Sequence, residues 1–301
     1  MRPAAVALIL LGLALPACGE DDPGGEGAIS VVATTTQLGD LARQVAGGRS
    51  DVSQVLPPNA DPHDYEPRPS DARDIERADV ILRSGGDLDE WLTETIDSSL
   101  TSAARVDVSK SVNERGGDPH WWQDPRNAVS AVRAIQRSLA EADPSGREEY
   151  GRNAGAYIAR LRRLDAGVAR CIGKLPRGAR KLVTTHDALG HYADRYGLDV
   201  IGAVIPSQSS QAQPSSKGIG ELVDQIEVEE VKAIFPESSL GSKLEDAVAR
   251  ESGVAVGGEL WADTLGPEGS SGATYIDSIA SNTEEIVKGL GGGAVTCRPN
   301  A

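Results

Sequence analysis

The chain has 301 residues, 39% of them hydrophobic, which is the length and composition of a globular protein with one large domain or two ordinary ones. Its 45 acidic side chains outnumber its 30 basic ones, giving a formal net charge of −15. This charge repels nucleic acid and anionic lipid, and no cluster of Lys or Arg offsets it, so nucleic-acid binding is excluded.

The first 17 residues have the pattern of a secretory signal peptide. Arg2 precedes the apolar run AAVALILLGLAL, which is too short to span a bilayer comfortably. The letters LPAC at 15–18 resemble a bacterial lipobox, which predicts a lipid on Cys18; ordinary secretion is the alternative. Residues 18–28 are rich in glycine and acidic residues and are typical of a flexible tether. We therefore expect a lipoprotein at the outer face of the cytoplasmic membrane.

Short β-branched runs alternate with helical patterns through residues 29–143, which predicts a parallel sheet covered by helices. Asp124 suits a helix cap and Pro125 a first turn, so a helix should follow His120 and its neighbours. The expected strands are 29–33, 51–56, 79–83 and 104–108, and the expected helices are 37–47, 70–78, 87–99 and 125–141.

Residues 144–172 are predicted to form one long helix between two lobes. Apolar residues recur there at helical spacing on one face: Tyr150, Ala154, Tyr157, Leu161, Leu164, Val168 and Ile172. At ~1.5 Å per residue such a helix is on the order of 40 Å long. The pattern indicates a rigid strut.

The segment 173–301 repeats the plan of the first lobe. The expected strands are 180–184, 199–205, 231–235 and 254–258, the expected helices are 187–196, 215–228 and 241–252, and the glycine-rich end indicates a helix stop and a tail. The fold class is therefore α/β, with two lobes that each hold a parallel sheet. Two further cysteines, Cys171 and Cys297, form an even pair in an exported protein, which favours a disulfide between them.

The histidines fall where α/β sheets bind ligands, in loops beyond the carboxyl ends of strands. His63, His120 and His186 each follow a predicted strand, and Asp263 follows the last one. Three imidazoles and one carboxylate suit a borderline ion such as Zn²⁺. Glu237 follows another strand and is either a further ligand or a carboxylate behind the ligands.

Each of these residues also has an ordinary interpretation. A single loop histidine is usually a surface residue or is locally hydrogen-bonded, and only the conjunction of four loops favours a metal site. His191 lies five residues after His186 within a predicted helix, roughly 140° round its axis, so it is expected to be structural. Trp121 and Trp122 are expected to pack the wall between the lobes.

Four motifs in this order carry a family resemblance: DPHDYEP, DPHWWQDPRNA, HDALGHYADRYGL and LWADTLG, arranged around a long central helix. They resemble the zinc/manganese-binding solute-binding lipoproteins of ABC importers, the cluster A-I or ZnuA-like family. The resemblance implies two (β/α)4 lobes that are joined by a rigid helix and hold one metal ion between them. It makes His63 and His120 the first lobe's ligands, and His186 and Asp263 the second lobe's. It further implies a permease and its ATPase as partners, and no enzymatic activity.

Two departures from the family pattern bear on the metal. The segment SKSVNERGGDP lacks the histidine-rich loop of many zinc-specific members, and His186 stands where manganese members usually have Glu. The first departure removes an accessory zinc-gathering device, whereas the second favours zinc at the main site. We expect a Zn²⁺ receptor, with Mn²⁺ or Fe²⁺ as the alternative cargo, and we expect it to be a monomer. A secreted zinc hydrolase is the alternative of another class, but the sequence lacks the H-E-x-x-H and G-x-S-x-G motifs. A second role in cell adhesion stays open.

Overall fold

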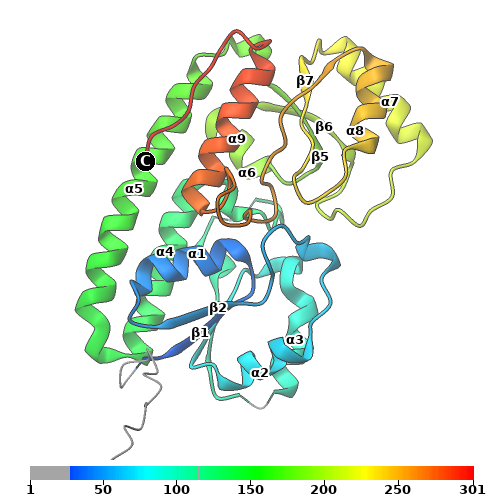
Figure 1. Cartoon of the computed structure of the whole chain (residues 1–301). Coiled ribbons are helices and arrows are strands. Elements are labelled where there is room, and N and C mark those ends of the chain that lie inside the picture. Colours follow the sequence, from blue (N-terminus) through cyan, green and yellow to red (C-terminus); the bar gives the residue numbers. More distant parts are fainter. Residues whose placement is uncertain (1–27, 100, 114) are drawn as a thin grey trace, which may run out of the picture.

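The computed structural model describes residues 28–99, 101–113 and 115–301 (Figure 1). The predicted signal peptide, Cys18 and nearly all of the tether lie outside the described residues. Within these ranges, no helix is both long and apolar enough to cross a membrane.

The first lobe is a parallel four-stranded sheet in the order β2-β1-β3-β4, with helices on its faces. Its elements, with η marking short 3-10 helices, are β1 (Ser30–Ala33), α1 (Thr36–Ala46), β2 (Asp51–Gln54), η1 (Pro62–Asp64), α2 (Pro69–Arg77), β3 (Val80–Arg83), η2 (Gly86–Leu92), α3 (Thr93–Ser98), β4 (Ala104–Asp107), η3 (Val108–Ser111), η4 (Trp121–Gln123) and α4 (Pro125–Ala142). All four predicted strands are present. The side chain of Asp124 accepts a hydrogen bond from Arg126 N and Pro125 occupies the first turn, so α4 begins as the sequence predicts.

A long helix, α5 (Arg147–Gly173), follows η5 (Pro144–Gly146) and runs alongside both lobes (Figure 1). It packs against α1 and α4 of the first lobe and against α6 (Gly190–Tyr196) and α9 (Tyr275–Leu290) of the second. The seven apolar residues of the predicted face are all buried. Because one helix contacts both lobes along its length, it acts as a strut and not as a flexible linker.

The second lobe contains two pairs of parallel strands, β5-β6 and β7-β8. A parallel bridge between Thr184 and Phe235 joins the pairs, so the strands lie in the order β6-β5-β7-β8. Besides α6 and α9, its elements are η6 (Arg177–Ala179), β5 (Lys181–His186), β6 (Asp199–Ile205), α7 (Ser216–Val228), β7 (Ala233–Ile234), α8 (Lys243–Ser252) and β8 (Ala255–Val256). Both lobes therefore have the predicted α/β plan.

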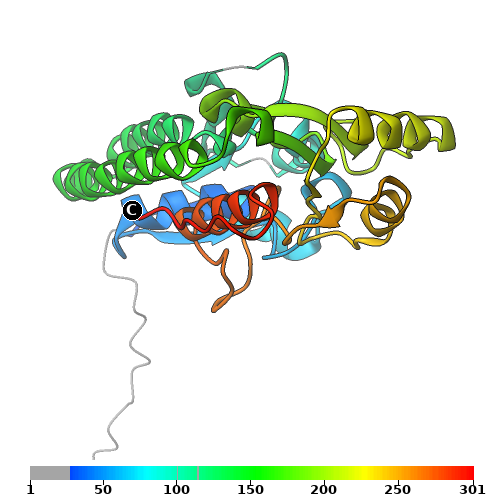
Figure 2. The ribbon, with the colours of Figure 1, turned by 90° about the horizontal axis from the view of Figure 1, so that it is seen from above.

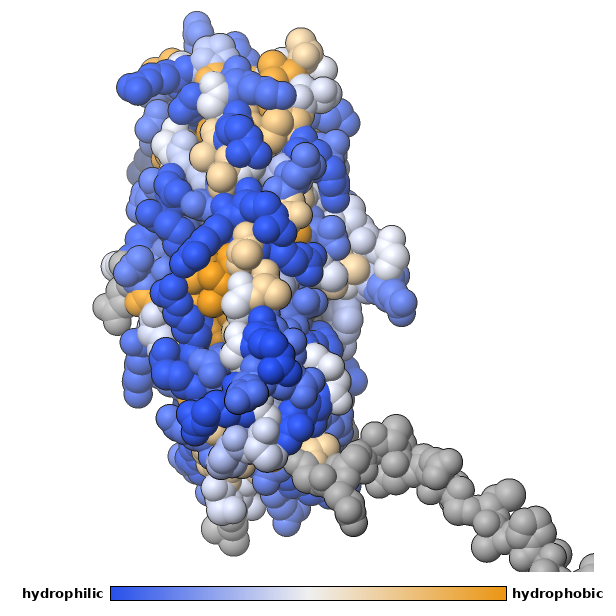
Figure 3. All heavy atoms as spheres, turned by 90° about the vertical axis from the view of Figure 1, so that its left-hand side faces the viewer, coloured by the Kyte–Doolittle hydropathy of each residue, from blue (hydrophilic) through white to orange (hydrophobic). Residues whose placement is uncertain are grey.

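The central core belongs to both lobes. One cluster of buried side chains joins α1, α4 and α5 to α6 and α9, whereas the side of the second sheet covered by α7 and α8 has a separate core. Figure 2 shows the blue α1 and the orange-red α9 on one side of the green α5. Cys171, in α5, is bonded to Cys297, which holds the C-terminal tail against the strut. The outer face of α5 is largely hydrophilic, with scattered apolar residues (Figure 3).

Most observed helices lie within one to three residues of the predicted bounds, and two of the differences have a structural cause. The predicted helix 187–196 begins only at Gly190, because β5 extends through His186. The predicted helix 87–99 is divided into η2 and α3, with a kink at Asp89. The buried carboxylate of Asp89 accepts hydrogen bonds from the nearby Ser84 N and from Thr34 Oγ1, which is 55 residues away, and these contacts favour the tighter turn over a regular helix.

Candidate metal centre

Four side chains that are distant in sequence converge between the lobes: His63, His120, His186 and Asp263. One ligand atom from each lies within 4.8 Å of every other. Asp263 is central, because one of its oxygens lies 3.1 Å from both His63 Nε2 and His186 Nε2, and the other lies 3.3 Å from His120 Nε2. The four residues that sequence reasoning singled out therefore form one cluster.

The cluster is almost closed to solvent. The side chains of His120, His186 and Asp263 are at most 1% exposed, and that of His63 is 8% exposed. His63 also lines an open cavity of about 490 Å³ with Trp91 and the backbone turn at 207–209. An ion that enters from this cavity would meet His63 before the other three side chains.

The same three-residue motif positions two of the histidines. In Asp61-Pro62-His63, the Asp61 carboxylate accepts a hydrogen bond from the His63 backbone N–H at 2.9 Å. In Asp118-Pro119-His120, the Asp118 carboxylate accepts from His120 N at 3.0 Å and also contacts His120 Nδ1 at 2.7 Å. The Asp118 contact leaves Nε2 of His120 facing the cluster. Sequence reasoning gave Asp118 no role, although the repeated Asp-Pro-His was a visible signal.

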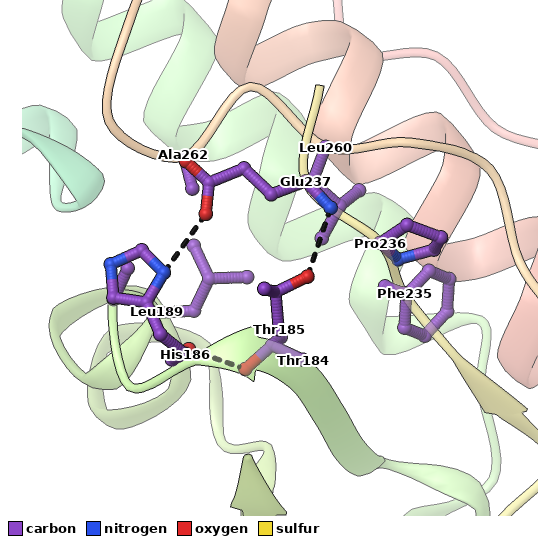
Figure 4. A pocket seen from close by; sticks show the side chains of 10 residues that line it. Thr184, Thr185, His186, Leu189, Phe235, Pro236, Glu237, Leu260 and Ala262 are labelled. Atoms are coloured by element: carbon purple, nitrogen blue, oxygen red, sulfur yellow. Dashed lines mark hydrogen bonds and ion pairs between the residues drawn. The ribbon is translucent and has the colours of Figure 1, made fainter. Parts of the chain in front are cut away.

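His186 is the last residue of β5 and has a carboxylate behind it. Its Nδ1 lies 2.8 Å from Glu237 Oε2, while its Nε2 points to Asp263. Figure 4 shows this contact, together with the hydrogen bond from Glu237 N to Thr185 Oγ1 that fixes the start of the Glu237 loop. Glu237 therefore lies behind a candidate ligand and is not a member of the converging set.

The loop that carries Asp263 belongs to the second lobe's chain and is also hydrogen-bonded to the first lobe. Ala262 O accepts hydrogen bonds from Trp122 Nε1 at 2.8 Å and Gln123 Nε2 at 2.7 Å. On the other side of Asp263, Leu265 N donates to Thr36 Oγ1 at 2.8 Å. The chain reaches Asp263 from a strand of the second lobe, but the first lobe holds its backbone on both sides. Only His186 of the four is carried by the second sheet itself.

The remaining aromatic and histidine predictions have different outcomes. Trp122 reaches the second lobe's chain at Ala262, as predicted, whereas the indole N–H of Trp121 contacts Ser84 of the first lobe. His191 is outside the cluster, and its Nε2 lies 3.3 Å from Asp118 O. Its structural place is as expected, but the reason differs, because His186 is in a strand and shares no helix with it.

The loop 206–214 meets the first lobe beside this cluster. Ser210 Oγ donates a hydrogen bond to Asp61 Oδ2 at 2.5 Å, so Asp61 contacts His63 through one oxygen and the second lobe through the other. The loop thus crosses the edge of the cavity at His63.

The electrostatics of the cluster favour a bound cation. Burial raises the pKa of Asp263, but the neighbouring His186 and His120 hold it well below its usual value. Burial lowers the pKa of His120, but the charges of Asp263 and Asp118 raise it to about 9. The pKa of His186 is likewise raised well above its usual value, against burial, by Asp263 and Glu237. Positive charge, as protons or as a metal ion, is therefore stabilised here.

The facing atoms lack hydrogen-bond partners. Among the described residues, this holds for Nε2 of His63, His120 and His186 and for both oxygens of Asp263. A buried polar atom without a partner costs about 1–3 kcal/mol, so five around one point are a large penalty. One cation with nitrogen and oxygen ligands would satisfy all of them. The lobes, the strut and this closed site define a two-lobed α/β binding protein for a metal ion.

Comparison with known proteins identifies the family. Residues 31–289 match the family described as ZnuA, zinc-uptake complex component A, periplasmic, and the chain belongs to this family. It is 32% identical over 302 residues to the manganese-binding lipoprotein MntA of Halalkalibacterium halodurans, covering 96% of this chain and 99% of the relative. It is 30% identical over 269 residues to the iron-binding protein YfeA of Yersinia pestis, covering 87% and 86%. The periplasmic zinc-binding protein TroA of Treponema pallidum has a similar structure, with a TM-score of 0.83, 30% identity, and coverage of 88% of this chain and 99% of that one.

These comparisons confirm the predicted family and fold and remove the hydrolase alternative. The chain is a receptor component of a metal-uptake system and not an enzyme. The relatives bear names for zinc, manganese and iron, so they support a divalent metal as the ligand without choosing among the three.

Proposed function

We propose that this protein captures Zn²⁺ outside the cytoplasm and delivers it to the permease of an ABC importer, which a partner ATPase drives. One observation carries the proposal: three imidazole Nε2 atoms and one carboxylate, all without hydrogen-bond partners among the described residues, converge between the lobes. Three nitrogens and one carboxylate oxygen can close a tetrahedral zinc site. His63, His120, His186 and Asp263 are the proposed ligands.

Glu237 and Asp118 are proposed as supports for the ligands. Each carboxylate contacts Nδ1 of a histidine whose Nε2 faces the cluster, at 2.8 Å for His186 and 2.7 Å for His120. Carboxylates behind metal-bound histidines commonly fix the ring orientation and raise the basicity of the ligand nitrogen. The metal affinity therefore depends on these two residues as well as on the four ligands.

The proposal also covers attachment and assembly. Residues 1–17 serve as a signal peptide, and a lipid on Cys18 anchors the mature chain as a monomer at the outer face of the membrane, with 18–28 as tether. Several relatives are lipoproteins by name, which supports the anchor. Intact mass of the native protein tests it: a water-soluble form cut at a site other than Cys18 would contradict the anchor. Mn²⁺ or Fe²⁺ is the second candidate cargo, which the names of the manganese and iron relatives favour.

Calorimetric titration of the metal-free protein with Zn²⁺, Mn²⁺ and Fe²⁺ tests the function. Replacing His63, His120, His186 or Asp263 by Ala should each weaken zinc binding at least 100-fold, because each loses a direct metal bond. His191→Ala is the matched control, since it removes a buried histidine near the cluster whose Nε2 faces the backbone oxygen of Asp118, at 3.3 Å, and not the proposed metal position. Failure of the wild-type protein to bind any of the three ions, or equal losses for His191→Ala and His186→Ala, would refute the proposal.

A further inference from the structure

One arginine contacts carboxylates from both lobes near the proposed metal site. Arg115 lies in the first lobe, in the loop between β4 and η4, and its Nε donates to Asp194 Oδ2 of α6 at 2.7 Å. Its Nη1 donates to Asp118 Oδ2 at 3.3 Å. The Asp118 side chain is fully buried, whereas that of Asp194 is 66% exposed. Arg115 therefore connects the surface of the second lobe to a buried carboxylate of the first.

That buried carboxylate is the one that holds His120. Asp118 Oδ1 accepts from His120 N and contacts His120 Nδ1, while Asp118 Oδ2 faces Arg115. The two oxygens of Asp118 thus have separate partners, and Arg115 fixes the side-chain torsion that presents Oδ1 to the imidazole. A continuous series of contacts runs from Asp194 through Arg115 and Asp118 to His120.

The first turn of α6 is shaped to accommodate this contact. A Cβ atom on Gly190 would collide with the Arg115 guanidinium and would lie 2.8 Å from Asp118 Oδ2. The next residue, His191, places Nε2 3.3 Å from Asp118 O. Because Gly190 has no side chain, the start of α6 can lie directly against the loop that orients His120.

Stability alone is a weak explanation for the arrangement. Arg115 is 33% exposed and Asp194 is 66% exposed, and ion pairs of such exposure contribute little to stability. What separates Arg115 from an ordinary surface ion pair is its second contact, with a carboxylate that has no exposure and touches a proposed ligand.

We propose that Arg115 is a positioning residue that couples contact between the lobes to the orientation of His120, an inference that rests on the proposed metal-receptor function. While α6 packs against the first lobe, Asp194 holds Arg115, Arg115 holds Asp118, and Asp118 keeps His120 Nε2 directed at the metal. When the lobes separate at α6, Arg115 loses one of its two carboxylates and His120 becomes less constrained. Retention of the ion therefore depends on the lobes being in contact.

The rate of zinc release tests this coupling. Full-length Zn²⁺-loaded protein is mixed with an excess of a chromophoric chelator, and the dissociation rate is recorded for the wild type, Arg115→Ala and Arg115→Lys. Arg115→Ala should release zinc about tenfold faster or more, within the range seen when supports of metal ligands are removed. Arg115→Lys should lie between the two, because a lysine supplies charge but not two directed donors. Arg152→Ala is the matched control, since Arg152 pairs only with Glu148 on the exposed face of α5.

A double-mutant cycle separates positioning from a merely structural role. In the Asp118→Asn background the link to His120 is already weakened, so adding Arg115→Ala should change the release rate less than twofold. The absorption spectrum of the Co²⁺-loaded Arg115→Ala protein should also shift, because it reports ligand geometry at the metal.

Release within twofold of wild type for Arg115→Ala, additive effects in the cycle, or an unchanged Co²⁺ spectrum would each overturn the inference. If Arg115→Ala does not fold, Arg115→Lys and Asp194→Asn, each expected to speed release at least threefold, decide the matter by the same measure. Failure of the wild-type protein to bind Zn²⁺, Mn²⁺ or Fe²⁺ would instead refute the proposed function, so the two failures are distinguishable.

Discussion

Replacing His186 by glutamate tests what sets the choice of metal. The wild-type set of three nitrogens and one carboxylate suits Zn²⁺, which also ranks above Mn²⁺ in the general order of divalent affinities. His186→Glu exchanges one nitrogen ligand for an oxygen ligand, and Mn²⁺ favours oxygen. We therefore expect the wild type to bind zinc more tightly than manganese, and the variant to show a smaller difference between the two ions.

The structure adds a charge effect to this exchange. His186 Nδ1 lies 2.8 Å from Glu237 Oε2, so a carboxylate introduced here lies near another carboxylate. Two unit charges about 3 Å apart repel by about 5–6 kcal/mol at an effective dielectric constant of 20. Burial and the charge of Asp263 already raise the pKa of Glu237, and a second carboxylate beside it raises this pKa further. The repulsion between the two carboxylates weakens the binding of both ions, so the ratio of the two affinities is left to ligand chemistry.

Competition titrations on metal-free wild type and variant measure the ratio of the two affinities. We expect the zinc-to-manganese ratio to fall at least tenfold in His186→Glu, which is about 1.4 kcal/mol. Adding Glu237→Gln removes the repulsion, so it should restore affinity for both ions without changing their ratio. A wild type that prefers Mn²⁺, or a variant with a larger zinc advantage, would show that residue 186 does not determine the preference.

Four further predictions concern protons, the disulfide and the interlobe loop. The pKa of His120 is raised to about 9 in the metal-free protein, so zinc must displace a proton below that pH. Zinc affinity should therefore rise with pH up to about 9, by about tenfold per pH unit for each proton released. A constant affinity between about pH 6 and 8 would contradict this prediction. Because its pKa is raised on folding, protonated His120 stabilises the metal-free protein. This contribution to the free energy of unfolding should be fully present below about pH 6.5 and should be lost as the pH rises through about 9, which thermal unfolding across this range can measure. The Cys171–Cys297 bond closes a loop with a sequence separation of 126. Its reduction should lower the free energy of unfolding, measured by denaturant titration, by on the order of 4 kcal/mol. Two reactive thiols in the unreduced protein would exclude the bond. Ser210→Ala removes the hydrogen bond to Asp61, worth about 1 kcal/mol, and should speed zinc release about fivefold in the chelator assay; an unchanged rate would show that the loop does not restrain the ion.

Much of the fold could be predicted because its signals are local. β-branched runs gave the strands within a few residues, and the apolar spacing from Tyr150 to Ile172 gave the strut. The ends of elements were harder, because tertiary contacts decide them. β5 continues to His186 because that residue pairs with Ile205 of β6, and η2 kinks at Asp89 because the distant Thr34 binds its carboxylate.

The candidate site could be predicted as a set of residues but not as an arrangement. The rule that ligands gather beyond the carboxyl ends of strands was enough to select His63, His120, His186 and Asp263. The attachment of the Asp263 loop to the first lobe depends on side chains such as Trp122, whose partner is 140 residues away. The role of Arg115 likewise requires two carboxylates at once, one of them from the other lobe. Sequence spacing carries no information on such contacts.

The unequal division of the cluster between the lobes has a consequence for how easily its chemistry can be changed. Three of the four side chains are held by the first lobe and by the loop attached to it, whereas His186 alone ends a strand of the second sheet. A substitution at this one position alters ligand chemistry while leaving the hydrogen bonds of Trp122, Gln123 and Thr36 in place. Under the proposed ligand set, one substitution at position 186 can therefore change the donor atoms offered to the ion without rebuilding the scaffold that holds the other three side chains.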